Sequence, residues 1–379
     1  MALTISKESL FDILQKAYPI IPLKSSLQIL SNFRISFNGS RIEITTTDLD
    51  QSLKISIPAD AQDSKTFDIT VNARKFFEII RELPPGMVSF SVEDNVVLLQ
   101  TDKNFSCKIA GADSNDFPGF PESSSDHEFE INPVLLKTMI PNSSFAVAKD
   151  ESRACLAGIL WEVSKDRTGM IATDGHRLGS CIINDSFSCE DKISGIISPK
   201  TLNNLLRNVD SKNDTKIKVL ISEKYITFIG NSFTLCSKLI DGPYPDYTKV
   251  IPASNPKEAI IDRVALLNAT KRASILSNQK THLIKFVFSE NTIEVIVVNK
   301  EIGGEAKEKI TIEYKGDVHT IGFNGQYFTE ILEIIKTEKV KISMNTQISA
   351  CLLFPVHKKE EEKISSDLFL IMPLRIMES

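Results

Sequence analysis

The sequence lacks the features that define several large classes of protein. No window approaches ~18 uninterrupted apolar residues, so we expect no membrane span. The first residues, MALTISKESLFDIL, have no basic stretch followed by a long apolar run, so we expect no secretory signal. With one Trp and 16 Gly in 379 residues, the chain is not low-complexity, collagen-like or disordered. The six Cys form no C-x-x-C pair, which predicts reduced, mostly buried thiols in a cytoplasmic protein.

Motifs of common catalytic and nucleotide sites are also missing. The sequence contains no G-x-x-x-x-G-K-[ST], G-x-G-x-x-G, G-x-S-x-G or H-E-x-x-H. Its five His form no H-x-x-x-H pair, and no D-x-D cluster offers convergent carboxylates. We therefore predict no metal, no cofactor and no catalytic residues.

Charge of one sign is not in large excess either. Lys and Arg number 44 against 49 Asp and Glu, a formal net charge of −5. This balance argues against a partner held mainly by bulk positive charge, such as DNA under a nonspecific basic coat. The charged run at 358–363 is interpreted as a solvated loop, with an interaction tail as the alternative.

What the sequence does contain is a repeat. Segments beginning at Phe67, Ile193 and His319, spaced by 126 residues, each read as a short apolar strand, a capping residue and an amphipathic helix. The predicted caps are Asn72, Ser198 and Asn324. The apolar positions of the three helices coincide at i, i+3, i+4 and i+7: Phe76, Ile79, Ile80, Leu83; Leu202, Leu205, Leu206, Val209; Phe328, Ile331, Leu332, Ile335.

A second predicted helix opens each repeat, after caps at Ser6, Asn132 and Asp262. The remaining segments alternate apolar and polar residues and are broken by N-G, E-D-N and D-G turns, which is typical of antiparallel hairpins. We predict an α+β fold of three repeated domains, each with two helices on antiparallel sheet. The predicted domains span residues 1–128, 129–257 and 258–379, joined by linkers rich in Pro, Ser and Asp.

The segment ATDGHRL at 172–178 allows two interpretations. Asp174 could orient His176 as a general base, with Arg177 binding an anion, as in a hydrolase or nuclease. Alternatively, Asp-Gly makes a tight hairpin turn and the next residues begin the outgoing strand. We favour the turn, because no nucleophile or metal partner accompanies the Asp-Gly-His sequence. Thr47-Asp48-Leu49 occurs 126 residues earlier at the matching position.

Several separated stretches resemble the bacterial sliding clamps, the β subunits of DNA polymerase III, along nearly the whole chain. They are TTTDLD, VNARKFFEIIRELP, IATDGHRLG, SKLIDGPYPDY, RASILSNQK and IMPLRI. The resemblance implies a head-to-tail homodimer, a ring with helices inside and sheets outside. Such a ring encircles double-stranded DNA without sequence preference and confers processivity without catalysis. The implied partners are the replicative polymerase α subunit, the clamp loader, other polymerases, ligase and mismatch-repair proteins, bound through a linear motif.

By the same resemblance, three sets of site residues are expected. The DNA-contacting positions are Lys24, Arg74, Lys149, Asp150, Arg153, Ala154 and Cys155, of which Asp150, Ala154 and Cys155 depart from the family's pattern. The partner-peptide groove is lined by Leu156, Thr173, Gly175, His176, Arg177, Leu178, Pro245, Lys249, Val250, Ala350, Leu370, Met372, Pro373, Leu374 and Arg375. The dimer interface pairs Phe105 and Cys107 with Ile275 and Leu276.

Some positions differ from those of relatives. Ala350 stands where the family often has Ser, Lys249 where Arg is common, and Cys107 where a larger apolar residue is common. Residues 377–379 extend past the family's usual end, where they could cover part of the groove. A repeat scaffold without any DNA role remains a further alternative.

Overall fold

The computed structural model describes residues 3–59, 66–102, 105–121, 125–189, 191–210, 216–359 and 364–376. The chain divides into two compact units. Unit 1 comprises Met1–Val134 with Lys200–Leu239, and unit 2 comprises Leu135–Pro199 with Ile240–Ser379. The central third of the sequence therefore contributes strands to both units. The domain boundaries at residues 128 and 257 stay a prediction.

The predicted repeat is present in the order of elements. Among the described residues, each repeat runs strand, α-helix, four strands, α-helix, three strands, with one additional short strand in the third and short 3₁₀ helices between some of these elements. The helices are α1 (Lys7–Ala17), α2 (Ala73–Glu82), α3 (Pro133–Ser144), α4 (Pro199–Asn208), α5 (Arg263–Leu276) and α6 (Gly325–Ile334). Among the caps, the side chains of Asn72, Asn324, Ser6 and Asp262 accept hydrogen bonds from backbone N–H groups in the first helical turn.

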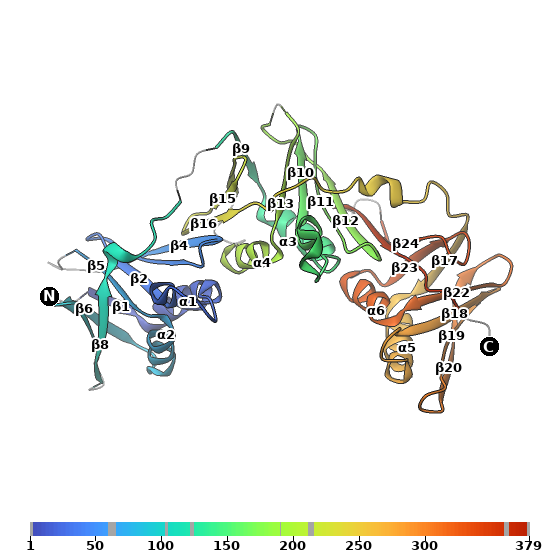
Figure 1. Cartoon of the computed structure of the whole chain (residues 1–379), viewed down its shortest axis with the longest axis horizontal. Helices are drawn as coiled ribbons and strands as arrows, with labels where there is room; N and C mark the ends of the chain where they lie inside the picture. The colour runs from blue at the N-terminus through green and yellow to red at the C-terminus, as the bar shows by residue number, and fades with distance from the viewer. Residues whose placement is uncertain are drawn as a thin grey trace. The chain divides into compact units, whose positions relative to one another are not determined.

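Unit 1 is built on one twelve-stranded antiparallel sheet. Its strand order is β1-β6-β7-β8-β5-β2-β3-β4-β16-β15-β14-β9, and α1 packs beside α2 (Figure 1). The strands are β1 (Leu3–Ser6), β2 (Asn32–Phe37), β3 (Arg41–Thr47), β4 (Gln51–Pro58), β5 (Phe67–Asn72), β6 (Met87–Glu93), β7 (Val96–Thr101), β8 (Ser106–Asp113), β9 (His127–Ile131), β14 (Ile217–Ile221), β15 (Tyr225–Ile229) and β16 (Phe233–Lys238).

Unit 2 contains a nine-stranded sheet and a four-stranded sheet. Their orders are β13-β10-β11-β12-β25-β24-β23-β17-β21 and β20-β19-β18-β22, and α5 packs beside α6 (Figure 1). The strands are β10 (Ile159–Ser164), β11 (Arg167–Thr173), β12 (Arg177–Asn184), β13 (Ile193–Ile197), β17 (Lys257–Asp262), β18 (Leu283–Ser289), β19 (Thr292–Asn299), β20 (Gly304–Thr311), β21 (Glu313–Tyr314), β22 (His319–Asn324), β23 (Lys339–Met344), β24 (Cys351–Val356) and β25 (Ser366–Ile371).

The helix periodicity predicts the core accurately. All four apolar positions of α6 and its following turn are buried, as are three of the four in each of the other two repeats, where Ile79 and Leu206 are partly exposed. Each such side chain contributes roughly 1.5–3 kcal/mol by leaving water. The apolar face of the repeat therefore holds the helices on their sheets. No helix among the described residues is long and apolar enough to span a membrane.

Candidate functional site

The Asp-Gly sequence forms a hairpin turn between β11 and β12. The Asp174 carboxylate accepts hydrogen bonds from the backbone N–H groups of His176 (2.9 Å) and Arg177 (3.0 Å). The Thr173 hydroxyl donates to the Arg177 carbonyl and accepts from the N–H of Gly175, whose φ is +87°. Such a positive φ strongly favours glycine. Asp174 is thus occupied in building the turn, as the turn interpretation predicts.

Arg177 connects this turn to helix α6. Its side chain is 2% exposed and pairs with the Asp174 carboxylate at 3.0 Å and with Glu330 of α6 at 2.6 Å. The guanidinium also lies over the Tyr327 ring, 4.2 Å from its centroid, and over Phe145 at 5.4 Å. A planar cation held between two carboxylates and two rings has little freedom, so Arg177 fixes the turn to the helix.

His176, the other proposed catalytic residue, is exposed and stacks on Tyr327, with ring centroids 6.4 Å apart. Its backbone carbonyl accepts a hydrogen bond from the N–H of Met372 at 2.8 Å. This bond and the pairing of β12 with β25 bring the turn and the C-terminal strand together, with Leu178 opposite Leu370. The predicted groove residues from these two distant segments therefore lie side by side.

The predicted groove residues fall into a buried set and an accessible set. Leu178, Leu370 and Ala350 belong to one apolar cluster together with Ile171 and Leu352, and Leu156 is also buried. The accessible residues include Gly175, His176, Pro245, Lys249, Val250, Met372 and Arg375, while Thr173, Pro373 and Leu374 are partly exposed. Val250 is 51% exposed and Met372 38% exposed, so apolar surface is available beside the turn. The groove assignment itself stays a prediction.

The linker that carries Pro245, Lys249 and Val250 is tied to the sheet by two tyrosines. The Tyr244 hydroxyl accepts the N–H of Thr173 at 3.0 Å, and burial raises the pKa of Tyr244. The Tyr247 hydroxyl donates to Glu162, and burial together with that carboxylate raises the pKa of Tyr247 to about 12. Both phenols therefore stay neutral at physiological pH. The linker is held against β10 and β11 rather than hanging free.

The C-terminal segment continues from β25 to β22. The N–H of Leu374 donates to the carbonyl of Gly322 at 2.8 Å, and a Cβ on Gly322 would lie 2.9 Å from the Leu374 carbonyl oxygen. Glycine at position 322 is what allows this close approach. Residues 377–379, predicted to extend toward the groove, lie outside the described residues.

The predicted DNA-contacting residues are placed in both units. In unit 1, Lys24 is exposed, and Arg74 on α2 is exposed and paired with Glu78. In unit 2, Lys149, Asp150, Arg153 and Ala154 are exposed and Cys155 is partly exposed. Lys149, Asp150 and Arg153 line a cavity of about 270 Å³ with Asp174, His176, Arg177 and Tyr327. Within unit 2, the structure therefore places part of the predicted DNA set next to the turn of the predicted peptide groove.

The predicted interface residues lie at strand edges and helix ends. Phe105 precedes β8 and is 36% exposed, and Cys107 is partly exposed. Ile275, near the end of α5, is 77% exposed, whereas Leu276 packs partly on the core. The role of these residues in a dimer stays a prediction.

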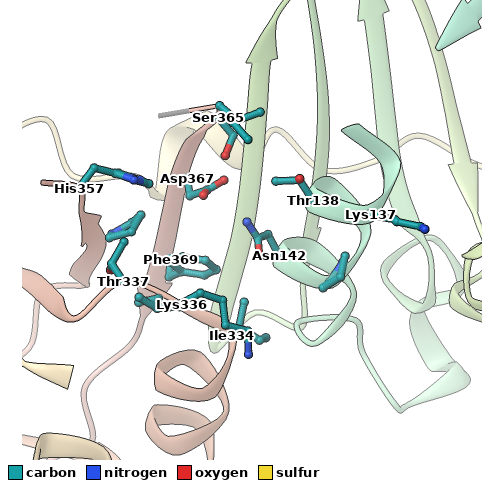
Figure 2. A pocket seen from close by; sticks show the side chains of 14 residues that line it. Lys137, Thr138, Asn142, Ile334, Lys336, Thr337, His357, Ser365, Asp367 and Phe369 are labelled. Carbon is teal, nitrogen blue, oxygen red and sulfur yellow. The ribbon is translucent and has the colours of Figure 1, made fainter. Parts of the chain in front are cut away.

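A second cavity, of about 440 Å³, was not predicted from the sequence. Side chains from α3, β24, β25 and the end of α6 line it, and His357, Asp367 and Asn142 belong to this lining (Figure 2). Nε2 of His357 and Oδ1 of Asp367 are buried and have no hydrogen-bond partner among the residues that the structure describes. None of the predicted groove or DNA residues lines this cavity.

Sequence reasoning missed four residues that organise the turn: Phe145, Tyr244, Tyr327 and Glu330. Glu330 is one of two acidic residues on α6, which carries no Lys or Arg. The signal for it was its place in the repeat, because Asn204 lies 126 residues earlier and makes the matching contact with Gln51.

Three family models cover this chain. They describe the N-terminal, central and C-terminal domains of the DNA polymerase III beta subunit, and they match residues 1–121, 130–246 and 248–373. Beta sliding clamps of Pseudomonas aeruginosa and Escherichia coli are each 30% identical to it, over 99% of this chain and 100% of theirs. The crystal structure of the Pseudomonas aeruginosa subunit matches with a TM-score of 0.91 at 29% identity, covering 99% of this chain and 100% of that one.

Three such domains in one chain define a DNA sliding clamp, a non-catalytic processivity subunit of a replicative polymerase. The chain belongs to the bacterial β sliding clamp family, the β subunits of DNA polymerase III. Nothing in the comparisons supports the hydrolase alternative, and the structure uses Asp174 in the turn and stacks His176 on Tyr327.

Proposed function

We propose that two copies of this chain associate head to tail into a closed ring around duplex DNA. The observation that carries this proposal is a pair of strand edges without partners. Among the described residues, β20 is the outermost strand of its sheet, and residues 106–110 of β8 pair only with β7. Unpaired N–H and C=O groups favour pairing with another chain. Phe105 and Ile275 supply apolar surface at these two regions.

Enclosure explains how a chain with a net charge of −5 retains DNA. A closed ring needs little affinity, because DNA leaves only through its ends or through an opened ring. Lys24, Arg74, Lys149 and Arg153 provide positive charge for phosphate contacts, which carry no sequence information and therefore permit sliding. A bound polymerase then stays at high effective concentration near the primer end.

The groove residues bind the linear motif of the polymerase α subunit, the clamp loader, other polymerases, ligase and mismatch-repair proteins. Apolar side chains, including the flexible Met372, adapt to several related peptides. A sliding clamp from Pseudomonas aeruginosa has been crystallised bound to griselimycin, so a clamp of this family binds a small ligand. We place the protein in the cytoplasm, where the chromosome is replicated.

Retention on DNA of different topology tests the ring. After loading by the clamp loader, the protein is expected to stay on nicked circular DNA and to be lost once the circle is cut. Equal retention on circular and linear DNA would overturn the ring and favour a scaffold without a DNA role.

The groove is tested by a double substitution, Val250→Ala with Met372→Ala. A fluorescein-labelled peptide carrying the polymerase motif is expected to bind roughly tenfold more weakly, because two apolar contacts are lost. Val298→Ala, a truncation of another exposed apolar residue in unit 2, is the matched control. Unchanged affinity in the double variant would contradict the groove assignment.

A further inference from the structure

The two units contain the same arrangement of strands and helix, which we call a joint. In the first joint, β16 pairs with β4 beside helix α4; in the second, β25 pairs with β12 beside helix α6. In both, the first residue of the hairpin strand reaches the helix. Asn204 Nδ2 donates to Gln51 Oε1 at 2.9 Å, and Arg177 Nη1 donates to Glu330 at 2.6 Å. Within each pair the two residues are 153 positions apart in the sequence, so the polar link is part of the repeat.

The strand registers identify the same position in the third repeat. The residue before the cap of the second helix leads, across three ladders, to one residue on each successive strand. The middle step extends the β2–β3, β10–β11 and β18–β19 registers by one residue. These residues are Val71, Phe33, Thr46 and Leu53 in the first repeat; Ile197, Ile159, Ala172 and Gly179 in the second; and Phe323, Ile284, Val297 and Ala306 in the third. Gly304 therefore stands where Gln51 and Arg177 stand.

The partner strand is identified in the same way. β8, β16 and β25 follow equivalent hairpins, and Cys107, Leu235 and Phe369 lie opposite Leu99, Phe228 and Leu353. At the two joints, Leu53 pairs with Leu235 and Gly179 pairs with Phe369. A third joint built on this pattern would place Ala306 opposite Cys107, from two different copies of the chain.

We propose that the seam between two copies of this chain, where β20 of one copy meets β8 of the other in this register, lacks the buried polar link of the two joints. The inference rests on the proposed ring. Glu78 follows its helix cap by six residues, as Asn204 and Glu330 follow theirs, so it holds the equivalent helix position. Gly304 has no side chain, so Glu78 of the second copy has no partner from the hairpin. The seam is therefore the least tightly held of the three contacts, and Gly304 determines this difference.

The register is tested with the native thiol of Cys107. Ala306→Cys, treated with dibromobimane, which fluoresces when it bridges two thiols, is expected to give a covalent dimer. Lys307→Cys is the matched control, because its side chain lies on the opposite face of β20. The double variant Ala306→Cys with Cys107→Ser should give no covalent dimer.

The outcomes separate the register from the ring. If the chain sediments as a dimer and dibromobimane cross-links the Lys307→Cys variant but not the Ala306→Cys variant, the register is wrong and the ring still stands. A chain that sediments as a monomer at all concentrations would overturn the ring itself.

The missing link is tested by Gly304→Gln, which gives this position the same side chain as Gln51 in the first joint. A Cβ at position 304 would meet Ile302 Cδ1 at 3.3 Å and Leu276 Cδ2 at 3.4 Å, which are the ends of flexible side chains, so the residue fits with small shifts. Subunit exchange, followed by fluorescence transfer between labelled copies, is expected to slow about tenfold, as for one added hydrogen bond to a charged group.

Two matched variants show whether the gain comes from the link. Gly304→Ala should exchange like the unmodified chain, and Gly304→Gln with Glu78→Ala should lose the tenfold gain. If Gly304→Gln exchanges no more slowly than Gly304→Ala, or keeps its gain without Glu78, the missing-link inference is overturned.

Discussion

The two joints share a backbone and differ in chemistry. In the first, a buried amide pair links the hairpin strand to the helix through Gln51 and Asn204, and each residue is 3% exposed. In the second, a buried cation, Arg177, is held between two carboxylates. The hairpin turn and the sheet that continues across the joint fix where the two side chains meet. Different hydrogen-bonding pairs are able to occupy that position. Geometry is thus set by the repeat, whereas the strength of each joint depends on its residues.

The largest expected effect comes from Arg177→Met, which removes the polar link of the second joint in unit 2. Loss of the cation leaves Asp174, which is 12% exposed, without its charged partner. We therefore expect the free energy of unfolding to fall by about 3 kcal/mol. This is the low end for a broken buried ion pair, because Glu330 is 41% exposed. Urea unfolding followed by Trp161 fluorescence measures this, since the chain's one Trp lies in β10 of the same unit. Lys249→Met, which alters an exposed cation, should change stability by less than ~0.5 kcal/mol. Equal effects would contradict the second joint.

Gln51→Ala tests the neutral link of unit 1. It leaves the buried Asn204 amide unsatisfied, which costs about 1–2 kcal/mol. Hydrogen exchange of α4 and β4, followed by mass spectrometry, should show the loss of protection there. Adding Asn204→Ala should cost little more, because the unpaired group is then removed. Additive losses from the two substitutions would show that the residues do not act as a pair.

Asp48 gives the first joint a pH dependence. Burial raises its pKa, but hydrogen bonds from Lys200 and the Gln51 N–H outweigh burial, and the pKa lies below the ordinary value of 3.8. The resulting stabilisation is complete above the unfolded pKa of ~3.9 and is lost as the pH falls through the lower folded value. Asp48→Asn should therefore lose less stability between pH 7 and pH 3 than the unmodified chain. Parallel pH curves for the two chains would contradict this assignment.

The smallest expected difference is at the turns themselves. Leu49 occupies the position of Gly175 and has a φ of +75°, a conformation that costs a side-chain-bearing residue roughly 1–2 kcal/mol. Leu49→Gly removes that strain but adds backbone entropy to the unfolded chain of about 0.5–1 kcal/mol, so a gain of a few tenths is expected. Gly175→Ala should destabilise instead. Denaturant midpoints measure both, and a large loss from Leu49→Gly would show that its side chain matters more than its strain.

Local patterns were sufficient to predict the repeat. A capping residue and four apolar positions at helical spacing depend only on nearby sequence, and the structure confirms the three helices that they predict. The turn at Asp174 was also predictable, because Asp-Gly favours a tight turn regardless of distant contacts. Tyr327 and Glu330 were not recognised, because their partners lie about 150 residues away and no local pattern marks such a contact.

The sequence by itself determined the three repeats, their helices and the family to which the chain belongs, because these are encoded in short-range spacing and recurring motifs. Only the tertiary structure decided that the central repeat is shared between two units, and that Arg177 is buried against α6 rather than exposed as an anion binder. The physical reason is that burial and pairing depend on which distant strands meet at a sheet edge. That choice is made by the long-range registers of β4 with β16 and of β12 with β25.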